Sequence, residues 1–379
     1  MIKSYKIRLY PTKEQEAKMW QHIGACRYIW NWMLTKQEEL HEAGEKHLSG
    51  FSMINLLKPL KNDGEHEWLY EVSNASLQTV CRDLDDAYKR FFKKQSGFPK
   101  FKSRKRSKPN YPLRCDKIHF EDSGRANIEK IGKVKYKTDF DLPTGRGCKF
   151  TNPRISNVNG KWMLSFGMEC ENQAPVLNDD AMGIDVGIKE TMVVAYGDKS
   201  VVFHNINKSK KVRGIKHRMR HLQRSISRKY EANKQGNAFV KTNNIARSED
   251  KLRRMYERLT GIRMNYIHQC THELVSLFPK RVVMEDLNVA GMMKNKHLAK
   301  AIQEQNFAEI IRQMQYKCEW LGIPFVQVGR FYPSSKTCSH CGCIHKGLKL
   351  KDRTFVCPEC GFTIDRDYNA ALNLMRYEA

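Results

Sequence analysis

The sequence contains no run of about 18 uninterrupted apolar residues, the least that a membrane-spanning helix needs. It opens on a strand-like alternation of apolar and polar side chains instead of a signal peptide. We find no internal repeat, no low-complexity tract and no heptad run long enough for a coiled-coil dimer. A membrane-spanning or secreted protein is therefore not expected, and the cytosol is the expected location.

Acidic residues are in short supply, with 41 Asp and Glu against 67 Lys and Arg, which gives a formal net charge of +26. This excess predicts a polyanionic partner, and nucleic acid is the first candidate because each phosphate offers a countercharge. Hydrophobic residues make up 40% of the chain, so it is too apolar for a disordered basic tail. Its 379 residues suffice for two or three domains.

Cysteine is scarce outside one segment, since five of the 12 cysteines fall between Cys338 and Cys360. Such clustering favours a metal site in a reducing compartment over a disulfide framework. The pairs Cys338-x2-Cys341 and Cys357-x2-Cys360 are separated by fifteen residues, the spacing of a four-thiolate zinc ribbon. A redox-active cysteine pair is the alternative.

The residues beside these pairs fit a ribbon as well. Gly342 and Gly361 each follow the second cysteine of a pair, where a tight turn is needed. Cys343 is a fifth thiol that competes for the metal but breaks the symmetry of the two pairs. Four thiolates leave no open position for water, so this Zn²⁺ is expected to be structural.

The first half of the chain is expected to combine helices with a small β-barrel or sandwich. Thr12 and Gln15 form a capping-box pattern before a long amphipathic helix, and a second helix is predicted over 75–95. Residues 115–172 contain short strands separated by Gly and Asn turns, and residues 2–9 supply a first strand.

A strongly basic segment runs from Lys89 to Lys108, with ten basic residues, no acidic residue and four interleaved phenylalanines. Pro99 within it, and Pro109 and Pro112 just after it, exclude a continuous helix here. Aromatic rings among the charges favour a strand-and-loop surface that contacts a nucleic-acid backbone and stacks on a base. The alternative is a solvated linker.

The second half alternates strands and helices, which is typical of an α/β layer. Strands are predicted over 182–187 and 281–285, with a tight hairpin turn at Gly197-Asp198. Residues 208–268 predict a helical hairpin with an apolar seam, and their eighteen Lys and Arg against four acidic residues favour contact with phosphates. A hairpin that is merely solvated is the alternative.

Three acidic residues lie where a sheet-based active site places them: Asp185 in a strand, Glu285 at a strand end and Asp367 at the start of the last helix. Carboxylates that converge hold two divalent ions about 4 Å apart for phosphodiester hydrolysis, and a set without His suits Mg²⁺. Each has a structural alternative as a turn residue, a solvated strand end or a helix cap. Alternation along the strand turns Asp286 away from Glu285, whereas the pattern does not separate Asp365 from Asp367.

Four motifs in this order closely resemble the TnpB family, the nucleases encoded by small bacterial insertion sequences and the apparent ancestors of type V CRISPR effectors. They are Gly183-Ile184-Asp185-Val186-Gly187, Val283-Met284-Glu285-Asp286-Leu287-Asn288, the stretch from Ser334 to Gly342, and Asp365-Arg366-Asp367-Tyr368-Asn369-Ala370-Ala371-x-Asn373. The N-terminal Arg8-Leu9-Tyr10-Pro11-Thr12 and Phe98-Pro99-Lys100-Phe101-Lys102 also look like that family.

The resemblance implies an α+β multidomain fold. A β-barrel wedge domain would comprise residues 1–10 and 96–172, with a helical recognition domain inserted at 11–95. An RNase H-like (RuvC) α/β nuclease domain would span 180–379, including the basic hairpin at 208–268 and a zinc ribbon at about 334–364. Asp185, Glu285 and Asp367 match the family's three catalytic, Mg²⁺-holding acids, and the family pattern favours Asp367 over Asp365.

The implied function is that of an RNA-guided DNA endonuclease whose guide RNA is transcribed from the transposon end. Its double-stranded target DNA carries a short adjacent motif, one RuvC site cuts both strands in turn, and one protein chain is expected per RNA. The residues expected to contact nucleic acid are Ser76, Gln78, Lys100, Phe101, Lys102, Arg104, Arg218, Arg224, Arg228, Arg253, Arg254 and Lys336. The alternatives are an RNA-guided binding protein without cleavage, an unguided structure-selective nuclease, a strand-joining transposase and a miniature CRISPR effector.

Overall fold

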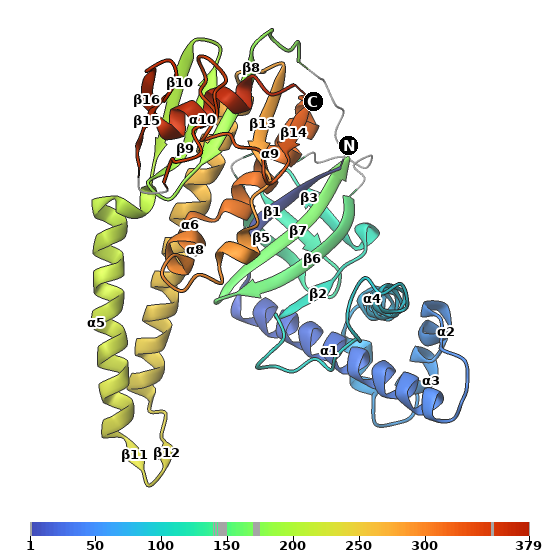
Figure 1. Cartoon of the computed structure of the whole chain (residues 1–379). Helices are drawn as coiled ribbons and strands as arrows, with labels where there is room; N and C mark the ends of the chain where they lie inside the picture. Colours follow the sequence, from blue (N-terminus) through green and yellow to red (C-terminus); the bar gives the residue numbers. More distant parts are fainter. Residues whose placement is uncertain are drawn as a thin grey trace. The chain divides into compact units, whose positions relative to one another are not determined.

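The computed structural model describes residues 2–138, 140, 142, 150–169, 175–349 and 352–378. The chain divides into two compact units, Met1–Glu171 and Asn172–Ala379 (Figure 1). Each combines helices with a sheet, so the α+β prediction is confirmed. Residue 172, the expected end of the wedge domain, and residues 350–351 of the expected ribbon lie outside the described residues. No helix among the described residues is long and apolar enough to cross a membrane.

The first unit is built around a curled sheet with seven strands among its described residues (Figure 1). The strands follow the order β2-β6-β7-β1-β5-β4-β3. Their bounds are β1 Ile2–Tyr10, β2 Asn110–Pro112, β3 Ile118–Glu121, β4 Arg125–Ile128, β5 Gly132–Lys137, β6 Phe150–Val158 and β7 Lys161–Glu169. β1 pairs antiparallel with β7 and β5, which confirms that the N-terminal strand joins the later ones. The described residues contain no ladder between the edge strands β2 and β3, so the sheet is curled rather than closed.

Helices of the first unit share one apolar core with this sheet. Their bounds are α1 Lys13–Glu42, α2 Gly50–Asn55, α3 Leu57–Lys61 and α4 Asn74–Phe92, with short 3₁₀ helices at Glu67–Glu71 and Cys115–Lys117. The predicted capping box is confirmed: the backbone N–H of Gln15 donates to Thr12 Oγ1, and that of Thr12 donates to Gln15 Oε1. Helix α4 ends at Phe92, three residues earlier than predicted.

The prediction of a strand in the basic segment is wrong, because residues 93–109 form no strand. At Lys100 and Lys102 the backbone is bonded to side chains of α1. The carbonyl of Lys100 accepts from Trp30 Nε1 at 3.1 Å, and Asn31 bonds both the N–H and the carbonyl of Lys102.

The second unit contains a mixed sheet of five strands in the order β10-β9-β8-β13-β14 among the described residues. Their bounds are β8 Ala181–Val186, β9 Glu190–Tyr196, β10 Lys199–His204, β13 Arg281–Glu285 and β14 Phe325–Val328. β9 runs antiparallel to β8 and β10, whereas β13 runs parallel to β8 and β14. The predicted turn at Gly197 is confirmed, with φ of +52°.

Helices cover both faces of this sheet. The remaining bounds are α5 Lys210–Ala232, α6 Asn243–Val275, α7 Val289–Met292, α8 Ala299–Gln305, α9 Phe307–Leu321, α10 Arg366–Met375, the 3₁₀ helix Ile206–Lys208, and strands β11 Lys234–Gln235, β12 Ala238–Phe239, β15 Thr354–Val356 and β16 Thr363–Asp365. Side chains of α6 and α9 pack on Met182, Ile184 and Met284, while α10 packs on Val193 and Val283 from the other face. Helices α8 and α9 are separated by Asn306, which adopts a left-handed φ of +55°.

The basic hairpin is present as α5 and α6, which project from the sheet (Figure 1). Their seam is apolar, with Val212, Ile215 and Met219 of α5 packed on Leu259 of α6. The two helices are joined through the two-residue strands β11 and β12, between which Gly236 makes a tight turn.

Candidate functional site

Asp185 and Glu285 lie on one face of the second unit's sheet. Strand β13 pairs parallel with β8, with Val283 beside Gly183. Residues two apart in a strand point to the same face of the sheet. Asp185 therefore lies on the same face as Gly183, and Glu285 on the same face as Val283. Val283 packs against Leu374 of α10. Both carboxylates therefore belong to the face that α10 covers.

Helix α10 lies on this face in backbone contact with β8. A β-carbon built on Gly183 would be 2.1 Å from the carbonyl oxygen of Ala371 and 2.3 Å from the backbone nitrogen of Met375. Asp367 lies about one helical turn before Ala371, at the N-terminal end of α10. The close packing thus brings Asp367 toward the end of β8 that carries Asp185.

The three acids lie close enough for Glu285 and Asp367 to affect the ionisation of Asp185. The pKa of Asp185 is raised well above its ordinary value, first by burial and then by the negative charges of Glu285 and Asp367. The neighbouring Arg366 and a backbone hydrogen bond oppose that rise only in part. A buried carboxylate whose negative charge is disfavoured by two neighbouring acids favours the binding of a cation at that place.

Two of the carboxylates are held by neighbouring side chains. The hydroxyl of Ser334 donates to Glu285 Oε1, and Arg366 donates to Asp367 Oδ1 from Nε at 3.3 Å and from Nη2 at 3.1 Å. Each carboxylate has further acceptor positions, so these bonds orient the group without saturating it. The residues fit Mg²⁺, whose preferred ligands are oxygen atoms.

Among the described residues, the three acids do not form a compact group of metal ligands like that of the four cysteines. A pair of ions about 4 Å apart tolerates such a spread, because each carboxylate contacts one or both ions.

The neighbouring acids have structural partners of their own. The carboxylate of Asp365 caps α10, accepting from the backbone N–H of Asp367 at 3.0 Å and of Tyr368 at 3.1 Å. Asp286 forms an exposed ion pair with Arg330 at 2.9 Å. These contacts separate Asp365 from Asp367, which the sequence pattern left open.

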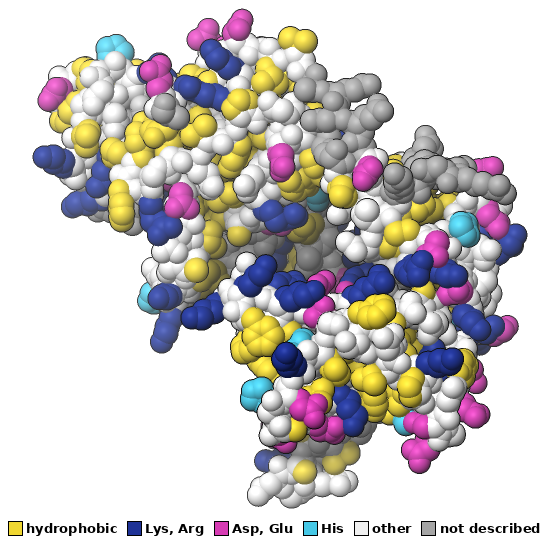
Figure 2. Space-filling model, turned by 90° about the vertical axis from the view of Figure 1, so that its right-hand side faces the viewer, with side chains coloured by type: hydrophobic (Ala, Val, Ile, Leu, Met, Phe, Trp, Pro, Cys, Tyr) yellow, Lys and Arg dark blue, Asp and Glu magenta, His cyan; other side chains and the backbone are white. Residues whose placement is uncertain are grey.

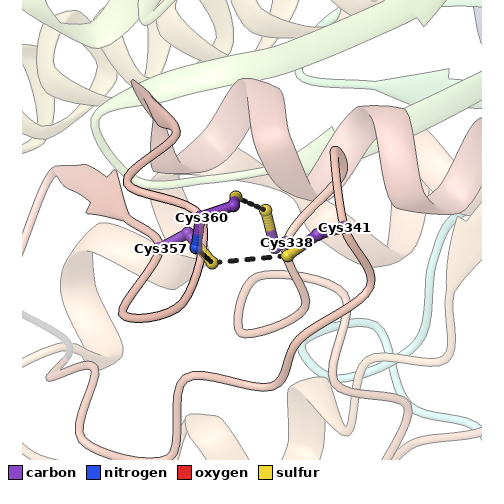
Figure 3. A group of neighbouring side chains, drawn as sticks. All are labelled: Cys338, Cys341, Cys357 and Cys360. Atoms are coloured by element: carbon purple, nitrogen blue, oxygen red, sulfur yellow. Dashed lines mark hydrogen bonds between the residues drawn. The ribbon is translucent and has the colours of Figure 1, made fainter.

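The four predicted zinc ligands form one compact cluster (Figure 3). All four sulfurs lie within 4.8 Å of one another, with Cys338 and Cys360 at 3.8 Å and Cys341 and Cys357 at 3.5 Å. Tetrahedral thiolates at about 2.3 Å from zinc would be about 3.8 Å apart, so the cluster fits Zn²⁺.

Local geometry explains the choice of thiols. Gly342 and Gly361 turn the two knuckles with φ of +78° and +67°, a conformation that glycine adopts without strain. Cys343 lies outside the cluster, and its carbonyl accepts from the N–H of Cys338 at 2.8 Å.

Two buried asparagines join the ribbon to α10. Asn369 Oδ1 accepts from the N–H of Ser339 at 3.0 Å, and its Nδ2 donates to the carbonyl of Thr337 at 2.7 Å. Asn373 Nδ2 donates to the carbonyls of Ser334 and Thr337. Sequence reasoning missed these roles, although the four-residue spacing of the two asparagines places them on one face of the helix.

The expected nucleic-acid contacts in the second unit are exposed. Lys336 lies beside the ribbon, and Arg218, Arg224, Arg228, Arg253 and Arg254 lie on α5 and α6. A surface groove on α5 is lined by Arg220, His221, Gln223, Arg224, Ser227 and Arg228. Lys and Arg side chains are spread among Asp and Glu over the face drawn in Figure 2, so the charge excess forms no single patch there.

In the first unit Lys100, Phe101 and Arg104 are exposed, and Gln78 is half-buried. The ammonium of Lys102 lies 3.4 Å from the ring centre of Trp30. A cavity of about 490 Å³ lies beside it, lined in part by Trp20, Arg27, Lys102, Arg104, Lys108 and Arg154. Ser76 is fully buried, so its side chain is not available to nucleic acid, contrary to expectation.

Three family models match the chain. The model described as “Helix-turn-helix domain” covers residues 1–46, “Probable transposase” covers 165–296, and “Cas12f1-like, TNB domain” covers 307–374. The described residues up to 46 contain β1 and the single helix α1 rather than a helix-turn-helix.

Known proteins resemble the chain over nearly its whole length. It is 30% identical over 393 residues to “Putative RNA-guided DNA endonuclease InsQ” of Escherichia coli (strain K12), covering 99% of this chain and 92% of the relative. It is also 30% identical to a “Putative RNA-guided DNA endonuclease” of Streptomyces pristinaespiralis, covering 98% and 88%. Its fold is similar to the protein in the “Cryo-EM structure of the Cas12f1-sgRNA-target DNA complex”, with a TM-score of 0.61, 14% identity and 99% of each chain covered.

Proposed function

Because the chain belongs to the TnpB family of insertion-sequence proteins, we propose that it is an RNA-guided DNA endonuclease. The observation that carries the proposal is the 30% identity, over 99% of the chain, to a protein named as such an enzyme. The reaction is hydrolysis of phosphodiester bonds. The clustered acids support the second unit as the part of the chain that carries out this hydrolysis.

The division into functional domains follows the family. Residues 180–379 form the RuvC-type nuclease domain, in which the sheet order β10-β9-β8-β13-β14 supports an RNase H-like topology. Residues 1–10 and 96–172 form the wedge domain, and 11–95 the recognition domain. The curled sheet and the helices α1 to α4 of the first unit support this assignment.

Catalysis depends on Asp185, Glu285 and Asp367, which hold Mg²⁺. Mg²⁺ held by these carboxylates would supply Lewis-acid activation of a water molecule and positive charge for the leaving oxygen. Ser334 orients the carboxylate of Glu285, and Arg366 orients that of Asp367. Because Asp185 is surrounded by two further acids and largely removed from water, its negative charge is stabilised chiefly when cations are bound.

Recognition of the target is divided between protein and RNA. A guide RNA transcribed from the transposon end pairs with double-stranded DNA beside a short adjacent motif, so base pairing reads the sequence and the protein contacts the backbone. The net charge of +26 and the exposed arginines of α5 and α6 support such backbone contacts. One chain binds one RNA, and its single site cuts both strands in turn.

Zn²⁺ has a structural role in this proposal. Held by Cys338, Cys341, Cys357 and Cys360, it fixes the ribbon to which Asn369 and Asn373 tie α10. The ribbon thereby holds the helix that carries Asp367.

The test is to purify the full chain from cells that carry its flanking DNA and to sequence the RNA that co-purifies. A discrete RNA with a segment matching DNA beside the element, and Mg²⁺-dependent cutting of a matching duplex, is the expected result. A defined RNA without any cutting would show a binding protein. Cutting without a defined RNA would show an unguided nuclease.

A further inference from the structure

Phe331 is the most exposed large hydrophobic side chain among the described residues, at 94%. It gains no packing energy there, because an exposed phenylalanine buries no apolar surface. Its neighbour Tyr332 packs its ring on Tyr377 at 5.1 Å and donates its hydroxyl to the carbonyl of Asn373 at 3.3 Å. The loop is thus anchored by the tyrosine, while the phenylalanine is presented to solvent.

The position of this loop places Phe331 at the edge of the candidate nuclease site. Strand β14 runs parallel to β13 and pairs Val328 with Glu285, so both strands end at the same edge of the sheet. Phe331 follows three residues after Val328. Ligands of parallel sheets bind at this carboxyl edge.

Two side chains of the same loop contact the end of β13. Arg330 pairs with Asp286 at 2.9 Å, and Ser334 donates to Glu285. These contacts flank Phe331 in the sequence and attach the loop on both sides of it. Lys336 follows as an exposed cation, and no acceptor for its ammonium occurs among the described residues.

We propose that Phe331 stacks on a base of the single-stranded DNA segment that enters the nuclease site and thereby helps to hold that segment there. The inference rests on the proposed function. Pairing of the guide RNA with one strand leaves unpaired DNA with free base faces. An aromatic ring accepts any base by stacking, so it suits an enzyme whose sequence specificity comes from RNA. Lys336 supplies a cation for the backbone of the same strand.

The test uses the full chain with its co-purified RNA, and the variants Phe331→Ala, Phe331→Leu and Phe331→Trp. Leucine preserves an apolar side chain but has no aromatic face, whereas tryptophan preserves the face. Loss of stacking is expected to raise KM for a matched target about five- to a hundred-fold in the Ala and Leu variants, with kcat much less changed. Phe331→Trp should retain the wild-type KM. All melting temperatures should match the wild type because the side chain is exposed.

A second readout does not require cutting. Single-stranded DNA oligonucleotides with 2-aminopurine at successive positions are titrated with the chain in buffer without Mg²⁺. Stacking on Phe331 quenches the fluorescence at a defined position for the wild type and Phe331→Trp, but not for Phe331→Leu.

The outcomes separate this inference from the proposed function. Quenching that depends on Phe331 in a chain that cuts no DNA would support the stacking contact and refute the nuclease. Normal cutting with unchanged KM and quenching in Phe331→Leu would refute the contact and leave the nuclease intact. Quenching only of 2-aminopurine placed in the guide RNA would overturn the assignment to DNA.

Discussion

Gly183 and Ala371 are in backbone contact: a β-carbon on Gly183 would lie 2.1 Å from the carbonyl oxygen of Ala371. Real side chains essentially never approach a backbone atom so closely. The glycine therefore determines how near α10 lies to β8. Since Asp185 follows Gly183 by two residues and Asp367 precedes Ala371 by four, the same contact sets the approach of the two acids.

Gly183→Ala should both destabilise the protein and remove its nuclease activity. The methyl group meets backbone atoms that have no rotamer to yield, so a loss of about 3 kcal/mol or more in the free energy of unfolding is expected. Gly261→Ala is the matched control, because Gly261 lies exposed within α6 with nothing within 4 Å of the added carbon. It should stabilise the helix by about 0.5–1 kcal/mol. Chemical denaturation of both variants measures the difference, and equal stabilities would contradict the packing argument.

Neutral amides at the three acids should remove cutting but not folding. We expect Asp185→Asn, Glu285→Gln and Asp367→Asn each to lower kcat by at least about a hundred-fold, the scale for losing one preorganised charged group. Asp365→Asn and Asp286→Asn are the controls and should keep most of the activity, since these residues cap α10 and pair with Arg330. Cleavage of a guided target under single-turnover conditions decides the matter. An Asp367→Asn enzyme as active as the wild type would refute the proposed site.

The same charge cluster makes a prediction about stability. In the absence of divalent metal, Asp185→Asn should raise the melting temperature by a few degrees. On folding, the buried Asp185 carboxyl beside Glu285 and Asp367 must either take up a proton or bear an unfavourable charge, and the neutral amide has no such cost. Added Mg²⁺ should stabilise the wild type more than the variant. Thermal melts with and without Mg²⁺ test this, and a variant that melts below the metal-free wild type would contradict it.

The sequence predicted local features of the fold well. The capping box at Thr12, the turn at Gly197 and the cysteine cluster each depend on residues close in the chain or on a fixed spacing, and the structure confirms them. The gathering of Asp185, Glu285 and Asp367 also followed from strand ends and motif order. Their catalytic role stays a prediction.

Contacts between residues far apart in the chain could not be predicted from the sequence pattern. Nothing local shows that Asn31 binds the backbone of Lys102, which is why a strand was wrongly expected in residues 93–109. Burial of Ser76 depends on the face that α4 turns to the core. The bond from Ser334 to Glu285 likewise joins segments that meet only through the sheet.

The ribbon should contain one Zn²⁺ per chain. Loss of this zinc should disorder the ribbon that holds α10 in place. Cys338→Ser or Cys357→Ser is expected to lower the zinc content and the melting temperature, since a structural site contributes its binding energy to folding. Cys343→Ser is the matched control, because that thiol lies outside the cluster. Metal analysis of the purified variants measures the stoichiometry. Full zinc content in Cys338→Ser together with loss in Cys343→Ser would overturn the ligand set.

Lys317 should make the free energy of unfolding depend on pH, and it does so away from the candidate site. Its side chain is buried on α9, where Nζ donates to the carbonyl of His268 at 3.0 Å and to Thr271 Oγ1 at 2.7 Å. No carboxylate pairs with it among the described residues, and burial lowers its pKa from 10.5 to about 8. The nearby Cys270 has a pKa raised to about 11 by burial, so it stays neutral across most of this range.

The sign of the effect follows from proton binding. Between pH 8 and 10.5 the unfolded chain keeps a proton on Lys317 that the folded chain has released, so stability rises with pH in this window. Lys317→Met removes this pH dependence. It also removes the cost of burying the charged ammonium, which the folded wild type bears below pH 8. Relative to the variant, the wild type should therefore gain at least about 1 kcal/mol between pH 7 and about 9.5. Urea unfolding of both proteins at each pH measures the gap, and other titrating groups cancel in the difference. A gap that is constant with pH would show that Lys317 titrates near its ordinary value.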